Sequence, residues 1–369
     1  MIHSMRLKNF KPFADQFFEF KPLTLLSGLN STGKSSLLQS LLLLRQSHQQ
    51  RLLPNIGLAL NGELVRIGTA QDALFEGAKT EEISFEVVLE NSLEGIWRFN
   101  YDREVDVLNL ASSPVVPEVY KSSLFNNKFH YLQAERIGPR AFFEMSDFQV
   151  RQLGQLGVRG EYTAHFLSIN GLQVIPNSSL IYPEAKSLDL IDQVEAWMGE
   201  VSPGTRIKIN SNPDIDLMNL QYSYGDSNLY RATNVGFGIT YTLPIIVAVL
   251  ASEPGTLILL ENPEAHLHPQ GQAKMGELLA LAASCGVQVV IETHSDHVLN
   301  GIRLAVHGGK LEPEDVQLHY FQRQEKLGQA VTKVISPRID RNGRIDQWPD
   351  GFFDEWDKSL EMLLEPAGE

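Results

Sequence analysis

The chain has 369 residues, of which 43% are hydrophobic and 21% are charged, an ordinary composition for a globular protein of two or three structural units. Its net charge of −14 argues against a protein that coats nucleic acid, and its single cysteine, Cys285, excludes a disulfide framework and suits a reducing cytoplasm. The first residues lack the apolar region of a signal peptide, and the longest apolar stretch, 243–260, is interrupted by Ser-Glu-Pro-Gly, so we expect no membrane span.

The strongest motif occupies residues 28–36, which read Gly-Leu-Asn-Ser-Thr-Gly-Lys-Ser-Ser. It fits the phosphate-binding loop pattern Gly-x-x-x-x-Gly-Lys-[Ser/Thr], with a β-prone run before it and an apolar helical run after it. In this order backbone N–H groups and a helix N-terminus face a polyphosphate, while Lys34 reaches the β- and γ-phosphates and Ser35 binds Mg²⁺. The weaker alternative is a glycine turn that caps a core helix. The predicted nucleotide-binding residues here are Gly28, Asn30, Ser31, Thr32, Gly33, Lys34, Ser35 and Ser36.

The middle of the chain changes character twice. Residues 56–139 are β-like, with strands expected at 58–67, 83–89, 95–99 and 129–136. Residues 140–230 mix helical patches, such as 188–198, with Gly/Pro/Asn/Asp-rich turns, and they show no sustained heptads that would predict a coiled-coil arm. A local basic groove or, more plainly, ion pairs on a solvated face are the two interpretations of the arginines Arg136, Arg140, Arg151 and Arg159.

Strands and helices alternate again from residue 234. A glycine turn at 234–240 leads into an apolar helix (241–251), and the buried strand 256–261 follows and ends in the carboxylate of Glu261. A helix at 269–284 and a second buried strand at 287–292 come next, before Thr-His-Ser at 293–295. This alternation predicts a parallel sheet with its chemistry at the carboxyl ends of the strands, and a terminal acid such as Glu261 is the type of residue that meets Mg²⁺ beside a phosphate loop.

The order of these motifs resembles the ATP-binding-cassette and SMC-type ATPases. Residues 261–269, Glu-Asn-Pro-Glu-Ala-His-Leu-His-Pro, are close to the metal-acid run of the soluble, non-transporter members, and a transporter subunit is therefore disfavoured. The ending Trp-Pro-Asp-Gly-Phe-Phe at 348–353 resembles a prokaryotic subfamily with a C-terminal domain of unknown function. Members of that subfamily are related to OLD-family and RecF-type ATPases and are common in anti-phage defence loci.

The resemblance implies a division of labour with ATP and Mg²⁺ as cofactors. Ser35 and Glu261 would hold the metal, Glu261 either directly or through a water molecule, and His294 would contact the γ-phosphate. Gly236 and Gly238 stand where the family has its signature motif, which binds the ATP of a second subunit, so a homodimer that forms on ATP is expected. No nuclease module is visible in the sequence, so a nuclease or toxin activity would come from a separate effector subunit.

One position departs from the family pattern. The residue after the metal-binding acid is usually a glutamate that activates the attacking water, and here it is Asn262. An amide can hold a water but cannot accept its proton at neutral pH. The hypothesis is a slow ATPase, with Glu264 as an alternative source of the base and normal hydrolysis as the alternative outcome.

Three other groups of residues have plainer interpretations than a functional site. A metal site at His266, His268, His294 and His297 lacks a standard zinc spacing, and the run Ser295-Asp296-His297 is no catalytic triad, because such partners converge in space rather than in sequence. The aromatic cluster Trp348, Phe352, Phe353 and Trp356 is typical of core, with a docking surface as the alternative.

The sequence therefore predicts an α/β P-loop NTPase, an ABC-type ATPase head with an antiparallel β lobe and an inserted helical lid. Its expected function is a cytoplasmic ATPase that gates an effector, and the alternative is a DNA-binding repair-type clamp that closes on DNA ends or gaps. The expected segments are an ATPase N-terminal part (1–55), the β lobe (56–139), the lid (140–230), an ATPase C-terminal part (231–310) and a C-terminal cap (311–369).

Overall fold

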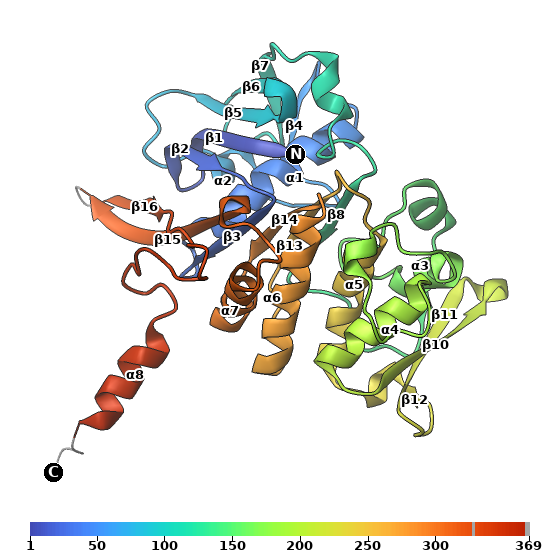
Figure 1. The fold of residues 1–369 in the computed structure, drawn as a ribbon. Coiled ribbons are helices and arrows are strands. Elements are labelled where there is room, and N and C mark those ends of the chain that lie inside the picture. Colours follow the sequence, from blue (N-terminus) through green and yellow to red (C-terminus); the bar gives the residue numbers. More distant parts are fainter. Residues whose placement is uncertain (327–328, 366–369) are drawn as a thin grey trace.

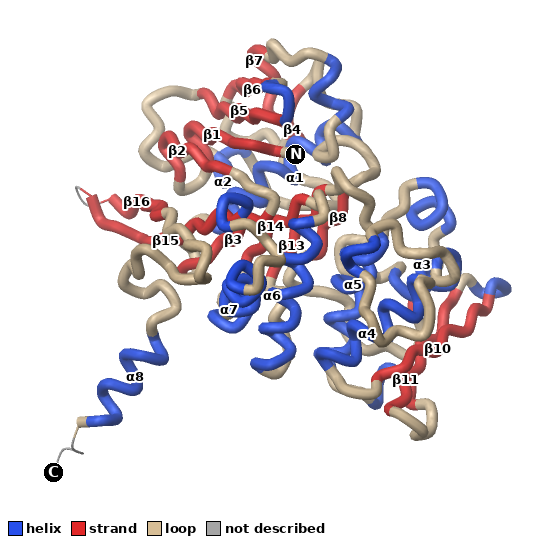
Figure 2. The backbone as a smooth tube through the Cα atoms, viewed as in Figure 1, coloured by secondary structure: helices blue, strands red, loops and turns tan. Residues whose placement is uncertain are grey.

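The computed structural model describes residues 1–326 and 329–365 and contains three sheets and eight helices in this part of the chain (Figure 1, Figure 2). The strands are β1 (Ile2–Phe10), β2 (Phe13–Glu19), β3 (Leu23–Gly28), β4 (Gly57–Ala59), β5 (Glu82–Leu89), β6 (Glu94–Asn100), β7 (Val107–Ser112), β8 (Phe129–Leu132), β9 (Phe143–Glu144), β10 (Thr205–Asn212), β11 (Leu217–Tyr224), β12 (Tyr230–Arg231), β13 (Leu257–Glu261), β14 (Gln288–Glu292), β15 (Val316–Lys326) and β16 (Gln329–Ile335). The helices are α1 (Lys34–Gln49), α2 (Ala70–Ala73), α3 (Thr163–Asn170), α4 (Leu190–Val201), α5 (Phe237–Ala251), α6 (Pro269–Ser284), α7 (Asp296–His307) and α8 (Glu355–Leu364).

The central sheet has the strand order β16-β15-β3-β14-β13-β8, parallel except for the edge strand β16. The inner strands β13 and β14 are apolar on both faces, because a core lies on each side of the sheet. Leu257 and Leu259 of β13 face the core shared with α1 and the β lobe, whereas Ile258 and Leu260 face the core shared with α5, α6 and α7. Figure 1 shows this sandwich, with α1 above the sheet and α6 and α7 below it. Alternation along a buried strand thus builds two cores at once.

The β lobe packs on α1 as an antiparallel sheet of order β2-β1-β5-β6-β7-β4. The leucines of α1 are buried between this lobe and the central sheet, and each buried leucine contributes roughly 1.5–3 kcal/mol. The expected strand at 58–67 is shorter, since β4 covers only Gly57–Ala59. The expected lobe of 56–139 needs a further correction, because β8 pairs with β13 in the central sheet. A four-residue apolar strand carries no signal for which sheet it joins.

The insertion expected as a helical lid at 140–230 contains α3 and α4 but also an antiparallel sheet in which β11 pairs with β9, β10 and β12. It stands at the side of the molecule beyond α5 in Figure 1. The hairpin of β10 and β11 was missed because its outer residues are polar and turn-rich, a pattern that is typical of loops as well as of exposed strands. The insertion is therefore a mixed α/β unit rather than a helical one.

The C-terminal segment does more than cap the fold. β15 joins the central sheet parallel to β3, the strand that leads into the phosphate loop, and β16 turns back along it. Of the aromatic cluster, Phe352 is fully buried against Tyr320, whereas Trp356 on the protruding helix α8 is 72% exposed. The core interpretation holds for Phe352 and fails for Trp356. Residues 327–328 and 366–369 of this predicted segment lie outside the described residues.

No helix in the described ranges combines the length and the apolar character that crossing a bilayer requires.

Candidate functional site

The phosphate loop connects β3 to α1 and depends on two glycines with positive φ. Gly28 has φ 137°, and a Cβ there would lie 2.2 Å from the carbonyl oxygen of Phe321 in β15. Gly33 has φ 107°, and a Cβ there would press on the rings of Pro12 and Phe13 at 2.8 and 2.9 Å. Only glycine meets both demands, since L side chains rarely adopt this conformation and no space is left. Close packing within the chain, together with the positive φ, therefore requires glycine at both positions of the motif.

The lysine of the loop is held in place by the loop's own backbone. Lys34 Nζ donates to the carbonyl oxygens of Gly28 and Leu29, both at 2.9 Å, and the side chain is buried. Burial lowers its pKa, and the charge of Glu292 works in the opposite direction. The hydroxyl of Thr32 also donates to Leu29 O at 2.7 Å. These bonds keep the loop closed around its lysine.

The remaining loop residues divide by exposure. Asn30, Ser31 and Ser35 are exposed, whereas Thr32 and Ser36 are buried under the helix start. Helix α1 begins at Lys34 after an N-cap glycine, and no side chain caps its first turn. Unpaired N–H groups at a helix N-terminus attract an anion, so this end of α1 can receive a phosphate.

Ser35 contacts the carboxylate of Glu292, a residue that was not predicted to belong to the site. Its hydroxyl donates to Oε1 of Glu292, the last residue of β14, over 3.0 Å. Glu292 is 7% exposed, and its Oε2 has no hydrogen-bond partner among the described residues. Burial and the nearby charge of Glu261 raise the pKa of Glu292 to about 7. The available signal was the acid that ends the second buried strand, in the same place as Glu261 on the first.

Glu261, the predicted metal ligand, lies beside Glu292 in the register of β13 and β14. Its carboxylate does not contact Ser35 directly. Oε1 accepts a hydrogen bond from the hydroxyl of Tyr131 at 2.9 Å, and Oε2 accepts one from the backbone N–H of Ala134 at 3.1 Å. Both partners come from β8 and the turn after it. The carboxylate thus ties β8 to β13 at the carboxyl edge of the sheet.

Glu264 braces the segment that carries His294. Its Oε2 accepts a hydrogen bond from the hydroxyl of Thr293 at 2.7 Å, and its Oε1 accepts one from the backbone N–H of His294 at 2.8 Å. Burial and the charge of Lys34 lower the pKa of His294, which favours a neutral imidazole. Because both oxygens of Glu264 are engaged, its contacts indicate a positioning role for the loop of His294.

Asn262 lies in the left-handed region with φ 45°, where asparagine is tolerated better than most residues. Its backbone N–H donates to the carbonyl oxygen of Glu292 at 2.8 Å, and its own carbonyl accepts a hydrogen bond from Nη2 of Arg136 at 2.7 Å. The backbone conformation gives this position a second reason to be asparagine, beside the chemistry of its side chain.

Arg136 is almost fully buried and donates hydrogen bonds to carbonyl oxygens from three segments. Its acceptors are the carbonyls of Gln133, Tyr241, Glu261 and Asn262, at 2.6–3.1 Å. Burial lowers its pKa to about 10, so it stays charged at neutral pH. The guanidinium joins the turn after β8, helix α5 and the end of β13 into one unit.

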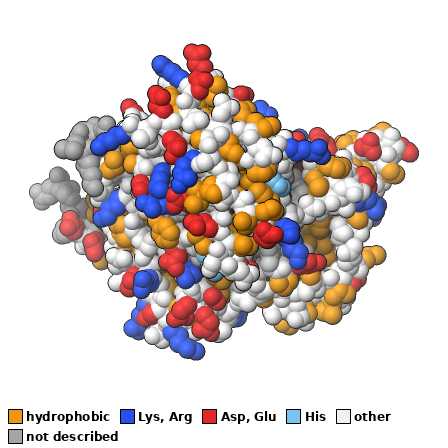
Figure 3. Space-filling view, turned by 90° about the horizontal axis from the view of Figure 1, so that it is seen from above, with side chains coloured by type: hydrophobic (Ala, Val, Ile, Leu, Met, Phe, Trp, Pro, Cys, Tyr) orange, Lys and Arg blue, Asp and Glu red, His pale blue; other side chains and the backbone are white. Residues whose placement is uncertain are grey.

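The expected basic groove does not include Arg136, because this side chain is buried. Arg151 pairs with Asp147 at 2.8 Å and Arg159 pairs with Glu135 at 2.9 Å, while Arg140 is exposed. On the face shown in Figure 3 basic and acidic side chains are interspersed. Arg151 and Arg159 therefore fit the plainer interpretation of ion pairs on a solvated face, whereas the buried Arg136 fits neither interpretation.

The two signature-type glycines differ in their surroundings. A Cβ on Gly238 would lie 2.5 Å from the carbonyl oxygen of His266, so this glycine is needed where α5 crosses the loop after β13. Gly236 is the N-cap of α5, without a side-chain cap, and an added Cβ there would meet no described atom within 4 Å. The rings of Phe237 and Tyr241 lie 5.5 and 4.9 Å from that of His266. Gly238 is thus required by packing within the chain, whereas Gly236 has free space in front of it.

The histidines form no separate metal centre. Within residues 1–326 and 329–365, no group of three His, Cys, Asp or Glu side chains is placed to hold a metal ion. His268 and Ser295 are N-caps of α6 and α7, where their side chains accept from the backbone N–H groups of Gln270 and Val298. Helix capping therefore explains His268 of the histidine group and Ser295 of the Ser-Asp-His run.

The C-terminal segment reaches the phosphate loop directly. The hydroxyl of Thr332 in β16 donates to the carbonyl oxygen of Thr32 over 2.8 Å, and Phe321 of β15 lies against Gly28. Residues 300 positions apart in sequence thus share the loop's environment, which no local pattern indicated.

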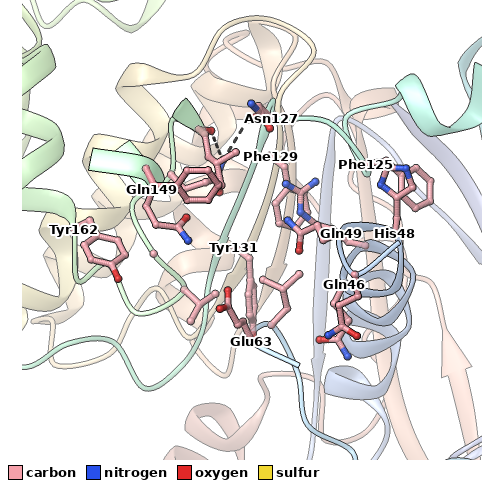
Figure 4. Close-up of a pocket in the computed structure, with 18 of the residues that line it drawn as sticks. Gln46, His48, Gln49, Glu63, Phe125, Asn127, Phe129, Tyr131, Gln149 and Tyr162 are labelled. Carbon is pink, nitrogen blue, oxygen red and sulfur yellow. Dashed lines mark hydrogen bonds between the residues drawn. The ribbon is translucent and has the colours of Figure 1, made fainter. Parts of the chain in front are cut away.

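A cavity of about 1020 Å³ lies at the other end of α1 (Figure 4). Gln46, His48 and Gln49 of α1 line one side, Gln149 and Tyr162 the other, and the rings of Phe129 and Tyr131 stand between them. Tyr131 also bonds Glu261 through its hydroxyl, so the cavity and the carboxylate edge share this one side chain. The phosphate loop itself does not line the cavity.

Three family models match separate parts of the chain. Residues 1–136 match an "AAA ATPase domain", residues 182–300 match an "AAA domain, putative AbiEii toxin, Type IV TA system", and residues 311–363 match a "protein of unknown function (DUF3696)". A search of curated proteins finds none whose sequence matches this chain.

Solved structures of SMC heads share the fold. An SMC head bound to the C-winged helix domain of ScpA has a TM-score of 0.53 at 13% identity, covering 91% of this chain and 97% of its own. An SMC head from Pyrococcus furiosus with an extended coiled coil, bound to the C-terminal domain of ScpA, has a TM-score of 0.52 at 11% identity and covers 99% of both chains. The solved structures show that the chain has the fold of an SMC head, and the two AAA-domain matches support an ATPase domain.

Proposed function

We propose that this protein is a Mg²⁺-dependent ATPase that dimerises on ATP and thereby gates a separate effector subunit, in anti-phage defence. Lys34 would bind the β- and γ-phosphates and the start of α1 would face them, with His294 at the γ-phosphate. The buried, partnerless oxygen of Glu292 and the hydroxyl of Ser35 fit a divalent cation beside the loop. The cation would neutralise phosphate charge, while the protein positions the nucleotide and the attacking water.

The observation that carries the dimer proposal is the open N-terminus of α5. Its first N–H groups have no side-chain cap, and Gly236 leaves free space in front of them. Gly238 lies against the loop that follows β13. In the sheet, β14 lies between β3 and β13, so this loop is two strand spacings, about 10 Å, from β3, the strand that leads into the phosphate loop. An anion site beside, but not in, the chain's own loop suits the γ-phosphate held by a second copy.

Light scattering would test the dimer with ATP·Mg²⁺, with ADP and without nucleotide, and turnover would be read on the same samples. We expect a dimer only with ATP·Mg²⁺, and we expect Gly236→Glu to abolish it, because the new carboxylate would repel the partner's phosphates. Gly199→Glu is the matched control, since Gly199 also has open space around it. The model is contradicted if the oligomeric state is the same with and without nucleotide, or if Gly236→Glu still forms a dimer with ATP·Mg²⁺.

Slow turnover is the second expectation, and Asn262→Glu tests it. A glutamate at 262 would supply a base for the attacking water, so we expect turnover per site to rise about tenfold or more, within the range of general-base effects. The left-handed φ of Asn262 would strain a glutamate, and thermal unfolding of the variant is therefore measured in parallel. Asn262→Asp, which keeps a side chain suited to this φ, is the companion variant. Unchanged turnover in both folded variants would remove Asn262 as the cause of slow hydrolysis.

The effector proposal takes support from the SMC heads that carry a ScpA domain, since a head of this fold can hold a second protein. The clamp alternative receives less support, because Arg136 is buried and Arg151 and Arg159 are paired with acids. Duplex and single-stranded DNA added to the turnover assay at two salt concentrations would separate the two. Strong, salt-sensitive stimulation would favour the clamp.

A further inference from the structure

We infer that Glu292, rather than Glu261, is the carboxylate that directly ligates the divalent cation beside Ser35. The inference deepens the proposed ATPase function and rests on it. It moves the direct metal ligand from the end of β13 to the end of β14, one strand closer to the strand of the phosphate loop.

The first argument is which carboxylate reaches the serine. Ser35 Oγ and Glu292 Oε1 are 3.0 Å apart, and β14 pairs directly with β3, with Glu292 opposite Leu26. Glu261 is one strand further away, and no hydrogen bond joins it to Ser35 among the described residues. A cation that binds the serine hydroxyl next to the β- and γ-phosphates therefore meets Glu292 first.

The second argument is which oxygen is free. Glu292 Oε2 is buried without a hydrogen-bond partner in the part of the chain that the structure describes. A buried acceptor left unpaired costs roughly 1–3 kcal/mol, more for a charged one, so such an atom calls for an explanation such as an ion. By contrast, both oxygens of Glu261 accept hydrogen bonds from Tyr131 and Ala134. Glu264 is likewise engaged by Thr293 and His294.

The third argument is charge. Glu261 and Glu292 are register neighbours on adjacent parallel strands, whose backbones lie about 4.8 Å apart, and Asn262 adds no charge. Two carboxylates at the ends of neighbouring buried strands repel each other, and a bound cation relieves that repulsion. Mg²⁺ takes oxygen ligands, commonly one or two carboxylates together with substrate phosphates. The cation would thus bind together with the nucleotide, and Glu261 would hold the neighbouring segments in place through its hydrogen bonds to Tyr131 and Ala134.

The test measures how much Mg²⁺ tightens nucleotide binding, which does not depend on turnover. The probe is mant-AMPPNP, a fluorescent analogue that resists hydrolysis, and its Kd is measured in Mg²⁺ and in EDTA for each variant. We expect Glu292→Gln to lose at least about tenfold of the Mg²⁺ enhancement, the scale of losses around metal sites, while its Kd in EDTA stays the same or falls. Glu261→Gln should lose less, and Glu292→Asp should lie between Glu292→Gln and the wild type.

Glu253→Gln is the matched control, because Glu253 is exposed just ahead of β13, away from the loop. Circular dichroism confirms that each variant is folded, and Glu292→Asp decides the question if Glu292→Gln does not fold. The inference is overturned if the Glu292 variants keep the wild-type Mg²⁺ enhancement or if Glu261→Gln loses more of it. A wild-type protein that binds no analogue under either condition overturns the ATPase proposal itself.

Discussion

Lys34→Met is expected to reduce ATP turnover by about 10²–10³-fold, the scale seen when one preorganised group that stabilises transition-state charge is removed. Lys34 Nζ is already held at the loop by the carbonyls of Gly28 and Leu29, so the ammonium needs little reorganisation to meet a phosphate. Methionine keeps the apolar length of the side chain and removes only the charge and its donors. Turnover and the Kd of the nucleotide analogue in Mg²⁺ would be measured together.

The control for this prediction is Lys21→Met. Lys21 precedes the strand that carries the loop and pairs with Glu19 at 3.0 Å, so its loss removes a surface ion pair without touching the loop. We expect its turnover to stay close to that of the wild type. Turnover of Lys34→Met within a few-fold of the control would mean that residues 28–36 do not bind the reacting phosphates.

Arg136→Ala is expected to destabilise the fold by on the order of 3–5 kcal/mol. The substitution leaves the carbonyls of Gln133, Tyr241, Glu261 and Asn262 without their buried donor, and each unsatisfied acceptor costs roughly 1–3 kcal/mol before water enters the cavity. The loss should appear as a lower midpoint of urea unfolding. Because the carbonyls of Glu261 and Asn262 lie at the carboxyl end of β13, beside the candidate site, turnover should also fall before the protein unfolds.

Arg140→Ala is the matched control, since Arg140 is exposed only four positions further along the chain. A surface substitution of this kind usually changes stability by less than about 0.5 kcal/mol. Arg136→Lys adds a second comparison, because one ammonium cannot span three segments as the guanidinium fork does. Equal unfolding midpoints for Arg136→Ala and Arg140→Ala would show that the buried guanidinium does not hold the segments together.

The local elements of the candidate site were predictable from the sequence. The phosphate loop between β3 and α1, the buried strands β13 and β14 and helix α6, which covers Pro269–Ser284 as expected, follow from short-range patterns. Their signals are glycine spacing, unbroken apolar runs and proline at a helix start, and each is complete within a few residues. The mixed α/β fold with an SMC-type head was likewise expected from the order of these motifs and is confirmed by the solved structures.

Contacts between distant segments were not predictable in this way. The placement of β8 and β15 in the central sheet decides that Tyr131 reaches Glu261 and that Phe321 lies against Gly28. The strand candidate at 129–136 carried no signal for its neighbours, and no strand was expected at β15, which lies in the segment predicted as a C-terminal cap. The hairpin of β10 and β11 was not predicted, because the polar residues on its exposed face are also typical of loops.

The sequence by itself determined the candidate phosphate-binding residues, because a loop, a lysine and a helix start that are adjacent in the chain are also adjacent in space. Only the tertiary structure decided which carboxylate stands at Ser35, because Ser35 and Glu292 are 257 positions apart and meet through the order β3-β14-β13. Two buried strands that both end in glutamate look alike in sequence. The sheet distinguishes them by placing Glu292 beside the phosphate loop and by occupying both oxygens of Glu261 with Tyr131 and Ala134.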